Sequence, residues 1–276
     1  MMTARIFRAY FLAVVLCGAA ISSAQTYLLT GQIKTVAGSG VQGSTGDGGA
    51  ATAAKLGASL GAAALDSAKN LYIADGGNSV IRKVDTSGSI STVAGTLGAN
   101  GYTGDGGAAT SATIDGPVGI VFDTAGNMYF SESNNHVIRK VDTSGKILTF
   151  KSLGFAPVGI AINSTNTIFI ADPSNNKIWK LDSSQNLGVF AGTGTAGYTG
   201  DAGAATSATL SGPVAVATDP TATSSSPTRA TMPFAKFLPV SSSPRLPGTA
   251  PPVIAAMAAP RPAPHSIIPA ALLPIR

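Results

Sequence analysis

Three aspartates, each preceded by a glycine in a glycine-rich segment, stand at repeated places in this chain and could bind a metal ion. Asp47 lies in Gly46-Asp47-Gly48-Gly49, and the two further copies contain Asp105 and Asp201. A carboxylate beside backbone carbonyls suits Ca²⁺, but Ca²⁺ takes six to eight oxygens and each loop offers one carboxylate. We therefore predict no metal site. The favoured interpretation is a tight turn in which the aspartate bonds its own backbone, and these three aspartates remain the metal candidates.

A second acidic set occupies one position in each of three repeats. It consists of Asp75, Glu132 and Asp172. One interpretation is an acidic ring built from the repeats. The other, which we favour, is that each residue ends a strand and accepts hydrogen bonds from turn amides. Trp179 stands where Arg82 and Arg139 stand in the other copies, either as a carbohydrate or peptide contact or as packing. Asp75, Glu132, Asp172 and Trp179 are the candidate binding residues.

Residues suited to catalysis are sparse. The chain has two histidines, His136 and His265, and Glu132 is its only glutamate. A histidine-rich metal site or a glutamate acid–base pair therefore cannot be assembled from these residues alone. No nucleophile elbow or phosphate-binding loop occurs in the repeats. We predict no catalytic residue, no cofactor and no enzymatic activity.

A repeat of 57 residues decides which elements carry these side chains. Thr35-Val36-Ala37-Gly38 recurs as Thr92-Val93-Ala94-Gly95, and a third, looser copy follows after 40 positions. The second copy contains four short runs of β-branched and aromatic residues, separated by turn residues: 118–122, 128–131, 137–141 and 146–150. They predict a four-stranded antiparallel meander. Such a sheet is exposed on both faces unless further sheets pack against it radially, as in a β-propeller.

The repeats resemble NHL-repeat propellers. The similarity is carried by Gly126-Asn127-Met128-Tyr129, then by residues 134–141, and by the matching residues of the other copies. More narrowly, the chain is similar to secreted bacterial members with Gly-Asp-Gly-Gly inserts between blades. The resemblance implies an all-β fold, with about three blades and the first strand of a fourth in residues 25–221.

The same resemblance implies two classes of function. The first, which we favour, is a non-catalytic binding or scaffold module with an unknown protein or carbohydrate ligand at the cell surface. The alternative is a propeller enzyme, lyase-like or lactonase-like, whose site is lost or not visible in this chain. Fold does not decide between them.

The N-terminus predicts secretion. Arg5 and Arg8 precede a short apolar run, and Ser22 and Ala24 are small residues at a cleavage position. We predict a signal peptide over residues 1–24, which removes the sole cysteine, Cys17. Export to the periplasm or the exterior follows, with no stable membrane insertion after cleavage.

Charge argues against a nucleic-acid partner. The chain has a net charge of +5, and residues 222–276 contain five basic and no acidic residues. The repeats are therefore neutral, and we predict no nucleic-acid binding.

The composition changes abruptly after Thr221. Residues 222–276 hold 12 of the 17 prolines, which predicts a disordered Pro/Ala/Ser-rich tail. A sharper hypothesis follows from the genetic code. In a shifted reading frame, each new codon consists of the third base of one codon and the first two bases of the next. In that frame the codons of Pro233 to Phe237 can encode Ile-Arg-Lys-Ile, and those of Met257 and Ala258 must encode glycine. We predict that residues from about 222 onward are an out-of-frame translation of a further blade, so that the propeller is truncated by a frameshift near residue 221.

Overall fold

The computed structural model describes residues 33–218. The predicted signal peptide (1–24) and the proline-rich tail (222–276) lie outside the described residues. Residues 37–218 belong to one compact unit. The helices of the described residues are short 3-10 turns, and none of them is long and apolar enough to cross a membrane.

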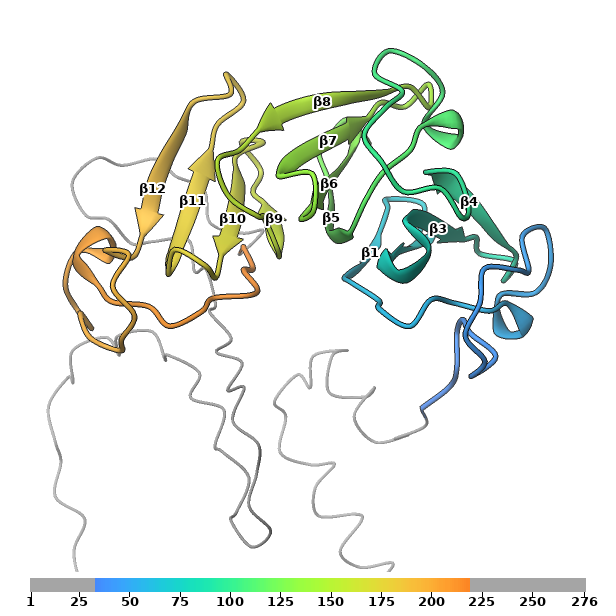
Figure 1. The fold of residues 1–276 in the computed structure, drawn as a ribbon, viewed down its shortest axis with the longest axis horizontal. Coiled ribbons are helices and arrows are strands. Elements are labelled where there is room, and N and C mark those ends of the chain that lie inside the picture. Colours follow the sequence, from blue (N-terminus) through green and yellow to red (C-terminus); the bar gives the residue numbers. More distant parts are fainter. Residues whose placement is uncertain (1–32, 219–276) are drawn as a thin grey trace, which may run out of the picture. The chain divides into compact units, whose positions relative to one another are not determined.

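The described chain is all-β and forms three four-stranded antiparallel sheets (Figure 1). Each sheet is a meander in sequence order. The first contains β1 (Ala63–Leu65), β2 (Leu71–Asp75), β3 (Val80–Val84) and β4 (Ile90–Ala94). The second contains β5 (Pro117–Phe122), β6 (Met128–Glu132), β7 (Val137–Val141) and β8 (Ile147–Ser152). The third contains β9 (Ile160–Ile162), β10 (Ile168–Asp172), β11 (Lys177–Leu181) and β12 (Leu187–Ala191).

The predicted meander of the second repeat is confirmed, with strand ends that differ by two residues or fewer. Its turns form as their residues predict. In the β7–β8 turn the Asp142 carboxylate accepts the amides of Ser144 and Lys146, and Gly145 takes a positive φ of 83°. These local bonds fix the register of the hairpin, so that alternate side chains face the neighbouring sheet.

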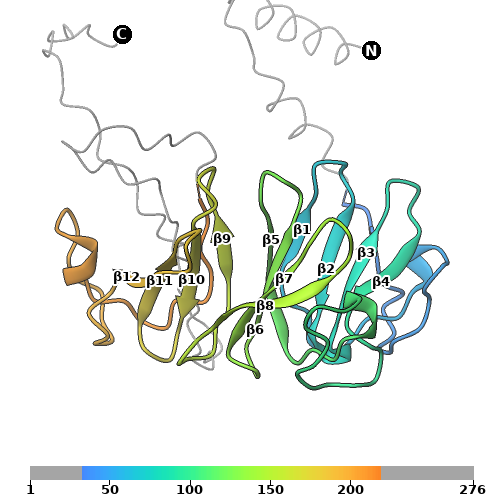
Figure 2. The same cartoon turned by 90° about the horizontal axis from the view of Figure 1, so that it is seen from above.

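The sheets pack face to face in chain order, as the blades of a β-propeller do (Figures 1 and 2). One apolar cluster joins Ala74 and Ile81 of the first sheet to Phe130 and Ile147 of the second. Another cluster joins Ile138 of the second sheet to buried residues of the third, among them Ile160, Ile168 and Ile170. The first strands of the sheets meet edge on, where the Ala62 amide donates to the Val118 carbonyl. The predicted fold class is therefore confirmed, and we call the three sheets blades one, two and three.

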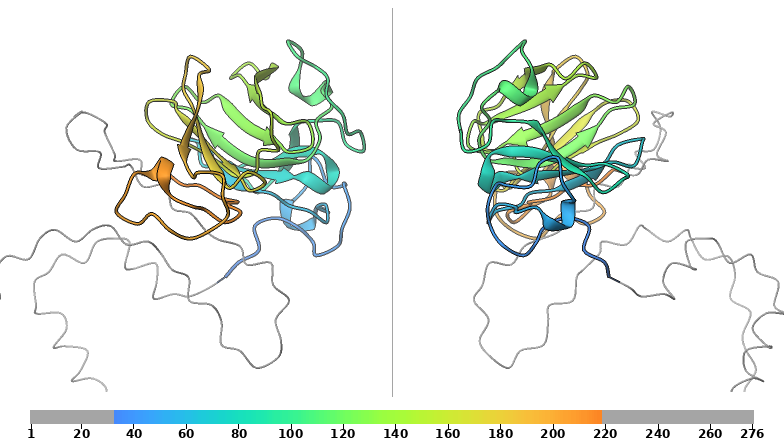
Figure 3. Two further views of the ribbon diagram at one scale, coloured as in Figure 1. Left: turned by 60° about the vertical axis from the view of Figure 1, so that its left-hand side comes forward. Right: turned by 90° about the vertical axis from the view of Figure 1, so that its right-hand side faces the viewer.

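Three glycine-rich inserts, at residues 38–57, 95–116 and 192–212, lie against the faces of the blades (Figure 3). Each contains one 3-10 turn: η1 (Ala51–Ala53), η3 (Ala109–Ser111) and η4 (Ala205–Ser207). Insert one covers blade one, and insert two lies between blades one and two. Insert three packs on blade three through Ala205 and Leu210.

The first strand of a fourth blade is expected before residue 221, and the structure describes this stretch as far as residue 218. Residues 214–218 form no regular strand. They do run beside β9, because the Gly159 amide donates to the Val214 carbonyl and the Thr218 hydroxyl donates to the Ile162 carbonyl.

Candidate functional site

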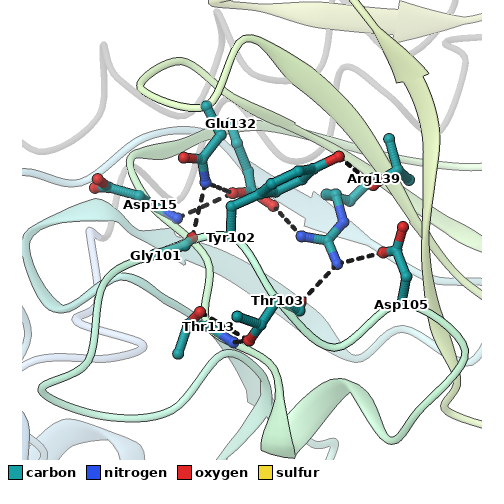
Figure 4. A network of polar contacts seen from close by, with 10 residues as sticks. Gly101, Tyr102, Thr103, Asp105, Thr113, Asp115, Glu132 and Arg139 are labelled. Atoms are coloured by element: carbon teal, nitrogen blue, oxygen red, sulfur yellow. Dashed lines mark hydrogen bonds and ion pairs between the residues drawn. The ribbon is translucent and has the colours of Figure 1, made fainter.

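A buried arginine on blade two binds insert two to the blade (Figure 4). Arg139 is fully buried on β7. Its guanidinium donates to Asp105 Oδ1 at 2.8 Å and to the Thr103 carbonyl at 3.0 Å, both in the insert, and to Glu132 Oε1 at 3.1 Å. The Tyr102 ring covers the guanidinium at 5.2 Å. One cation thus joins the insert to two strands of its own blade.

Glu132 is the acidic end of this network. Its carboxylate also accepts the Asp115 amide at 3.0 Å and the side-chain amide of Asn135. Burial raises the pKa of Glu132 above its ordinary value, while these hydrogen bonds and Arg139 act in the opposite direction. The native carboxyl group therefore binds a proton at a higher pH than the unfolded one. Its contribution to stability falls as the pH rises through that interval.

Blade one repeats the arrangement with a looser geometry. Arg82 is fully buried on β3, 2.5 Å from Asp47 Oδ1 and 3.9 Å from Asp75 Oδ2. The other Asp47 oxygen accepts the Thr92 amide at 3.0 Å. Among the described residues, none of the guanidinium nitrogens makes a hydrogen bond of regular geometry. Ser44 stands where Tyr102 stands in insert two, so this arginine has no aromatic cover from that position.

The acidic residues at the strand ends are buried and bonded within their blades. Asp75 accepts the Gly57 amide at 2.9 Å, and Asp172 accepts the Asn175 amide at 3.1 Å. Asp75, Glu132 and Asp172 are all fully buried. The structure thus places these candidate binding residues inside the blades, where they accept amide hydrogen bonds, and not on a surface open to a ligand.

Blade three lacks a preceding insert and carries a different side chain at the arginine position. Only residues 153–159 join β8 to β9. Trp179 replaces the arginine, stacks on Phe155 with the ring centroids 5.1 Å apart, and donates its indole N–H to Asp172 Oδ2 at 2.9 Å. The tryptophan fills the space of an arginine and keeps a donor for the buried carboxylate. The structure therefore places Trp179 in a packing contact.

The expectation that the aspartates of the inserts bond their own turn backbone is wrong for Asp47 and Asp105. A tight turn does form, since the Gly107 amide donates to the Gly104 carbonyl at 2.9 Å. The carboxylates of Asp47 and Asp105, however, bond the arginine of the following blade and not their own turn backbone. The physical reason is that a buried guanidinium needs a close anion. The sequence did not lead us to Arg82 and Arg139 as the partners of these aspartates. A signal was present, because blade three lacks both the preceding insert and the arginine.

The described residues offer little that resembles a reaction centre. Within residues 33–218 no group of three or more His, Cys, Asp or Glu side chains could hold a metal ion. A shallow hollow of about 240 Å³ lies between inserts one and two and is lined by Ser44, residues 77–79 and residues 98–100. Its walls are polar, and it is smaller than the roughly 300–1,000 Å³ of pockets that enclose small molecules. The arrangement can hold the surface of a polar ligand but does not enclose one.

Comparisons with known proteins leave the family open. No family model matches the chain, and no curated protein matches it. Solved structures give distant similarities only. Virginiamycin B lyase from Staphylococcus aureus is 20% identical with a TM-score of 0.39, over 58% of this chain and 45% of the lyase. The gluconolactonase XC5397 from Xanthomonas campestris is 15% identical with a TM-score of 0.43, over 59% of this chain and 55% of that one.

A chain of the nidogen/laminin complex is 18% identical with a TM-score of 0.43, over 59% of this chain and 53% of that chain. This chain thus spans about half the length of each of these proteins. Two of the three are named as enzymes and one belongs to a binding complex, so these similarities favour neither function class. What the structure establishes by itself is three consecutive four-stranded blades, the first two of which are held to their inserts by buried arginines.

Proposed function

We propose that this chain is a secreted, non-catalytic binding or scaffold module of the NHL type, with a protein or carbohydrate ligand at the cell surface. One observation carries the proposal: the carboxylates at the strand ends, and those of inserts one and two, hold the scaffold together. Asp47 and Asp105 bind inserts to blades, and Asp75, Glu132 and Asp172 lie inside the blades. Side chains used in this way fix rigid loops in place, and rigid loops are suited to binding.

The ligand surface that we propose is the polar hollow between inserts one and two. It is formed by loops that the buried arginines hold in position, and its lining supplies hydroxyl, amide and backbone groups. Such groups recognise sugar hydroxyls or an extended peptide by hydrogen bonds. Because the hollow is open, the ligand would be a segment of a larger polymer.

Binding to immobilised cell-surface polysaccharides and matrix proteins tests this proposal. In biolayer interferometry on the full chain, Asn100→Arg should fill the hollow and weaken binding at least tenfold. Thr124→Arg adds the same charge in an exposed turn between β5 and β6 and should leave binding unchanged. Equal losses for both variants would contradict the proposed surface.

The metal content of the purified protein tests the non-catalytic part. Mass spectrometry of the full chain should find no stoichiometric metal after exposure to Ca²⁺, Mg²⁺, Mn²⁺ and Zn²⁺ followed by dialysis. One tightly bound ion per chain would overturn the non-catalytic proposal and favour a propeller enzyme.

A further inference from the structure

Insert three has the same backbone fold as the insert that holds Arg139. In both inserts a threonine pair is bonded across the loop, with hydroxyl oxygens 2.9 Å apart in Thr103–Thr113 and in Thr199–Thr209. Gly104 and Gly200 take φ values of 93° and 102°, and an added Cβ would lie 2.5 Å and 2.6 Å from the facing alanine. The loop conformation that binds Arg139 in insert two is therefore also present in insert three.

The groups that contact Arg139 also recur in insert three. Tyr102, the Thr103 carbonyl and Asp105 surround the guanidinium, and Tyr198, Thr199 and Asp201 occupy the same positions. Tyr198 is 70% exposed, against 49% for Tyr102. Within residues 33–218, the Asp201 carboxylate has no hydrogen bond and no ion pair. An aromatic ring, a carbonyl and a carboxylate are thus arranged for a guanidinium that the described chain does not supply.

Arginine and insert occur together in the blades. Blades one and two follow an insert and carry Arg82 and Arg139, while blade three follows a short connection and carries Trp179. A buried cation without its anion would cost several kcal/mol, which explains the pairing. By the same rule, whatever follows insert three should present an arginine on its third strand.

We infer that insert three is a preformed receptor for the arginine of a fourth blade, and that this blade is encoded in the shifted reading frame of residues 222–276. The arginine codon spans Phe234 and Ala235, in the stretch that can encode Ile-Arg-Lys-Ile. It lies 33 positions after Asp201, whereas Arg82 follows Asp47 by 35 and Arg139 follows Asp105 by 34. This inference concerns how the fold is completed and does not rest on the proposed binding function.

A second copy of the chain fits the receptor less well. The arginines on the third strands of blades one and two are buried and already paired with Asp47 and Asp105. To reach Asp201 of another copy, either one would have to leave its own insert. A separate blade with an unpaired arginine has no such cost.

The nucleotide sequence gives the first test. The Phe234 codon must be TTC, because TTT would place cysteine in the shifted frame, and the frame must contain no stop codon over residues 222–276. TTC with an open frame is the expected result. TTT or a stop codon overturns the inference.

The second test compares the full chain as it stands with a full chain whose frame is restored by a one-base correction near codon 221. Asp201→Asn should leave the melting temperature of the existing chain unchanged. It should lower that of the restored chain by as many degrees as Asp105→Asn does. An unchanged melting temperature in the restored chain, or a fall of equal size in both chains, overturns the inference. A concentration-dependent dimer of the existing chain that Asp201→Asn dissociates would identify a second copy as the occupant instead.

Discussion

Pairs of residues change together between the repeats, and the contacts explain why. Tyr129 donates its hydroxyl to Asp123 at 3.2 Å, and Tyr72 and Asp66 occupy the same positions in blade one. In blade three both partners differ, and the positions hold Phe169 and Asn163. A ring without a hydroxyl group needs no anionic acceptor, and asparagine still accepts the turn amides of Thr165 and Thr167. Each pair is thus a functional unit that is kept or exchanged as a whole.

These tyrosines should ionise late when the pH is raised. Burial, and then the nearby aspartate charge, raises the pKa of Tyr72 and of Tyr129 to about 12. A pKa raised in this way adds stability that is complete below the ordinary value near 10 and is lost as the pH rises towards 12. Absorbance at 295 nm should show two tyrosines titrating near pH 12. Tyr129→Phe should remove one of them, and titration of both near pH 10 in the folded protein would refute the assignment.

Replacing Arg139, the buried arginine of blade two, should lower the free energy of unfolding. Arg139→Met leaves Glu132 buried without its cation, and breaking a buried pair from one side typically costs about 3–5 kcal/mol of unfolding free energy. Urea denaturation followed by circular dichroism measures the loss. Lys140→Met on the same strand removes only a half-buried cation above the Tyr129 ring, and should cost less than about 1 kcal/mol. Equal losses for both variants would show that the charge network contributes nothing specific.

The strands were predictable from sequence, but the contacts of the inserts were only partly so. Turn residues and β-branched runs are local signals, so β7 was predicted at its observed residues. Whether Asp105 bonds its own turn or a distant partner depends on folding across 34 positions, which local spacing does not encode. The presence of tryptophan at position 179, where the other repeats have Arg82 and Arg139, indicated that a contact changes in blade three. Only a structure shows that this position faces an insert.

One position with a positive φ holds glycine in inserts one and two and alanine in insert three, and this predicts a difference in stability. Gly48 and Gly106 take φ values of 82° and 83°, and at the matching place in insert three Ala202 takes 64°. A left-handed conformation costs a residue with a Cβ about 1–2 kcal/mol, partly offset by the lower entropy of alanine in the unfolded chain. Ala202→Gly should therefore stabilise the protein by about 0.5–1 kcal/mol in thermal unfolding.

Ala204→Gly provides the control for that substitution. Ala204 has an ordinary extended backbone, so glycine there should only add freedom to the unfolded chain and lower the stability. A stabilising effect of both substitutions would show that backbone strain at Ala202 is not the cause.

Blade spacing across the whole unit depends on glycines in the first strands or just before them. At Gly119 an added Cβ would lie 2.8 Å from the Ile160 backbone nitrogen of blade three, and at Gly61 it would lie 2.4 Å from the Val118 carbonyl oxygen of blade two. Gly119→Ala should push blades two and three apart and cost about 1–3 kcal/mol. Gly188→Ala, at an open position of β12, should be neutral or slightly stabilising. The melting temperatures of the two variants compare them directly. Similar values would refute the idea that the close contact between blades two and three excludes a side chain at position 119.

The arginine contact also bears on how such a chain grows in evolution. A unit of 57 residues contains an insert and the blade that follows it, so one duplication copies both Asp47 and Arg82. Each new unit therefore arrives with its anion and cation already matched. Deletion of an insert has a different consequence. It removes the aspartate that pairs with the buried arginine, so a second substitution must replace that arginine. Blade three, with its short connection and its tryptophan, has the form expected after both changes. Adding a repeat thus takes one duplication, whereas losing an insert takes two changes.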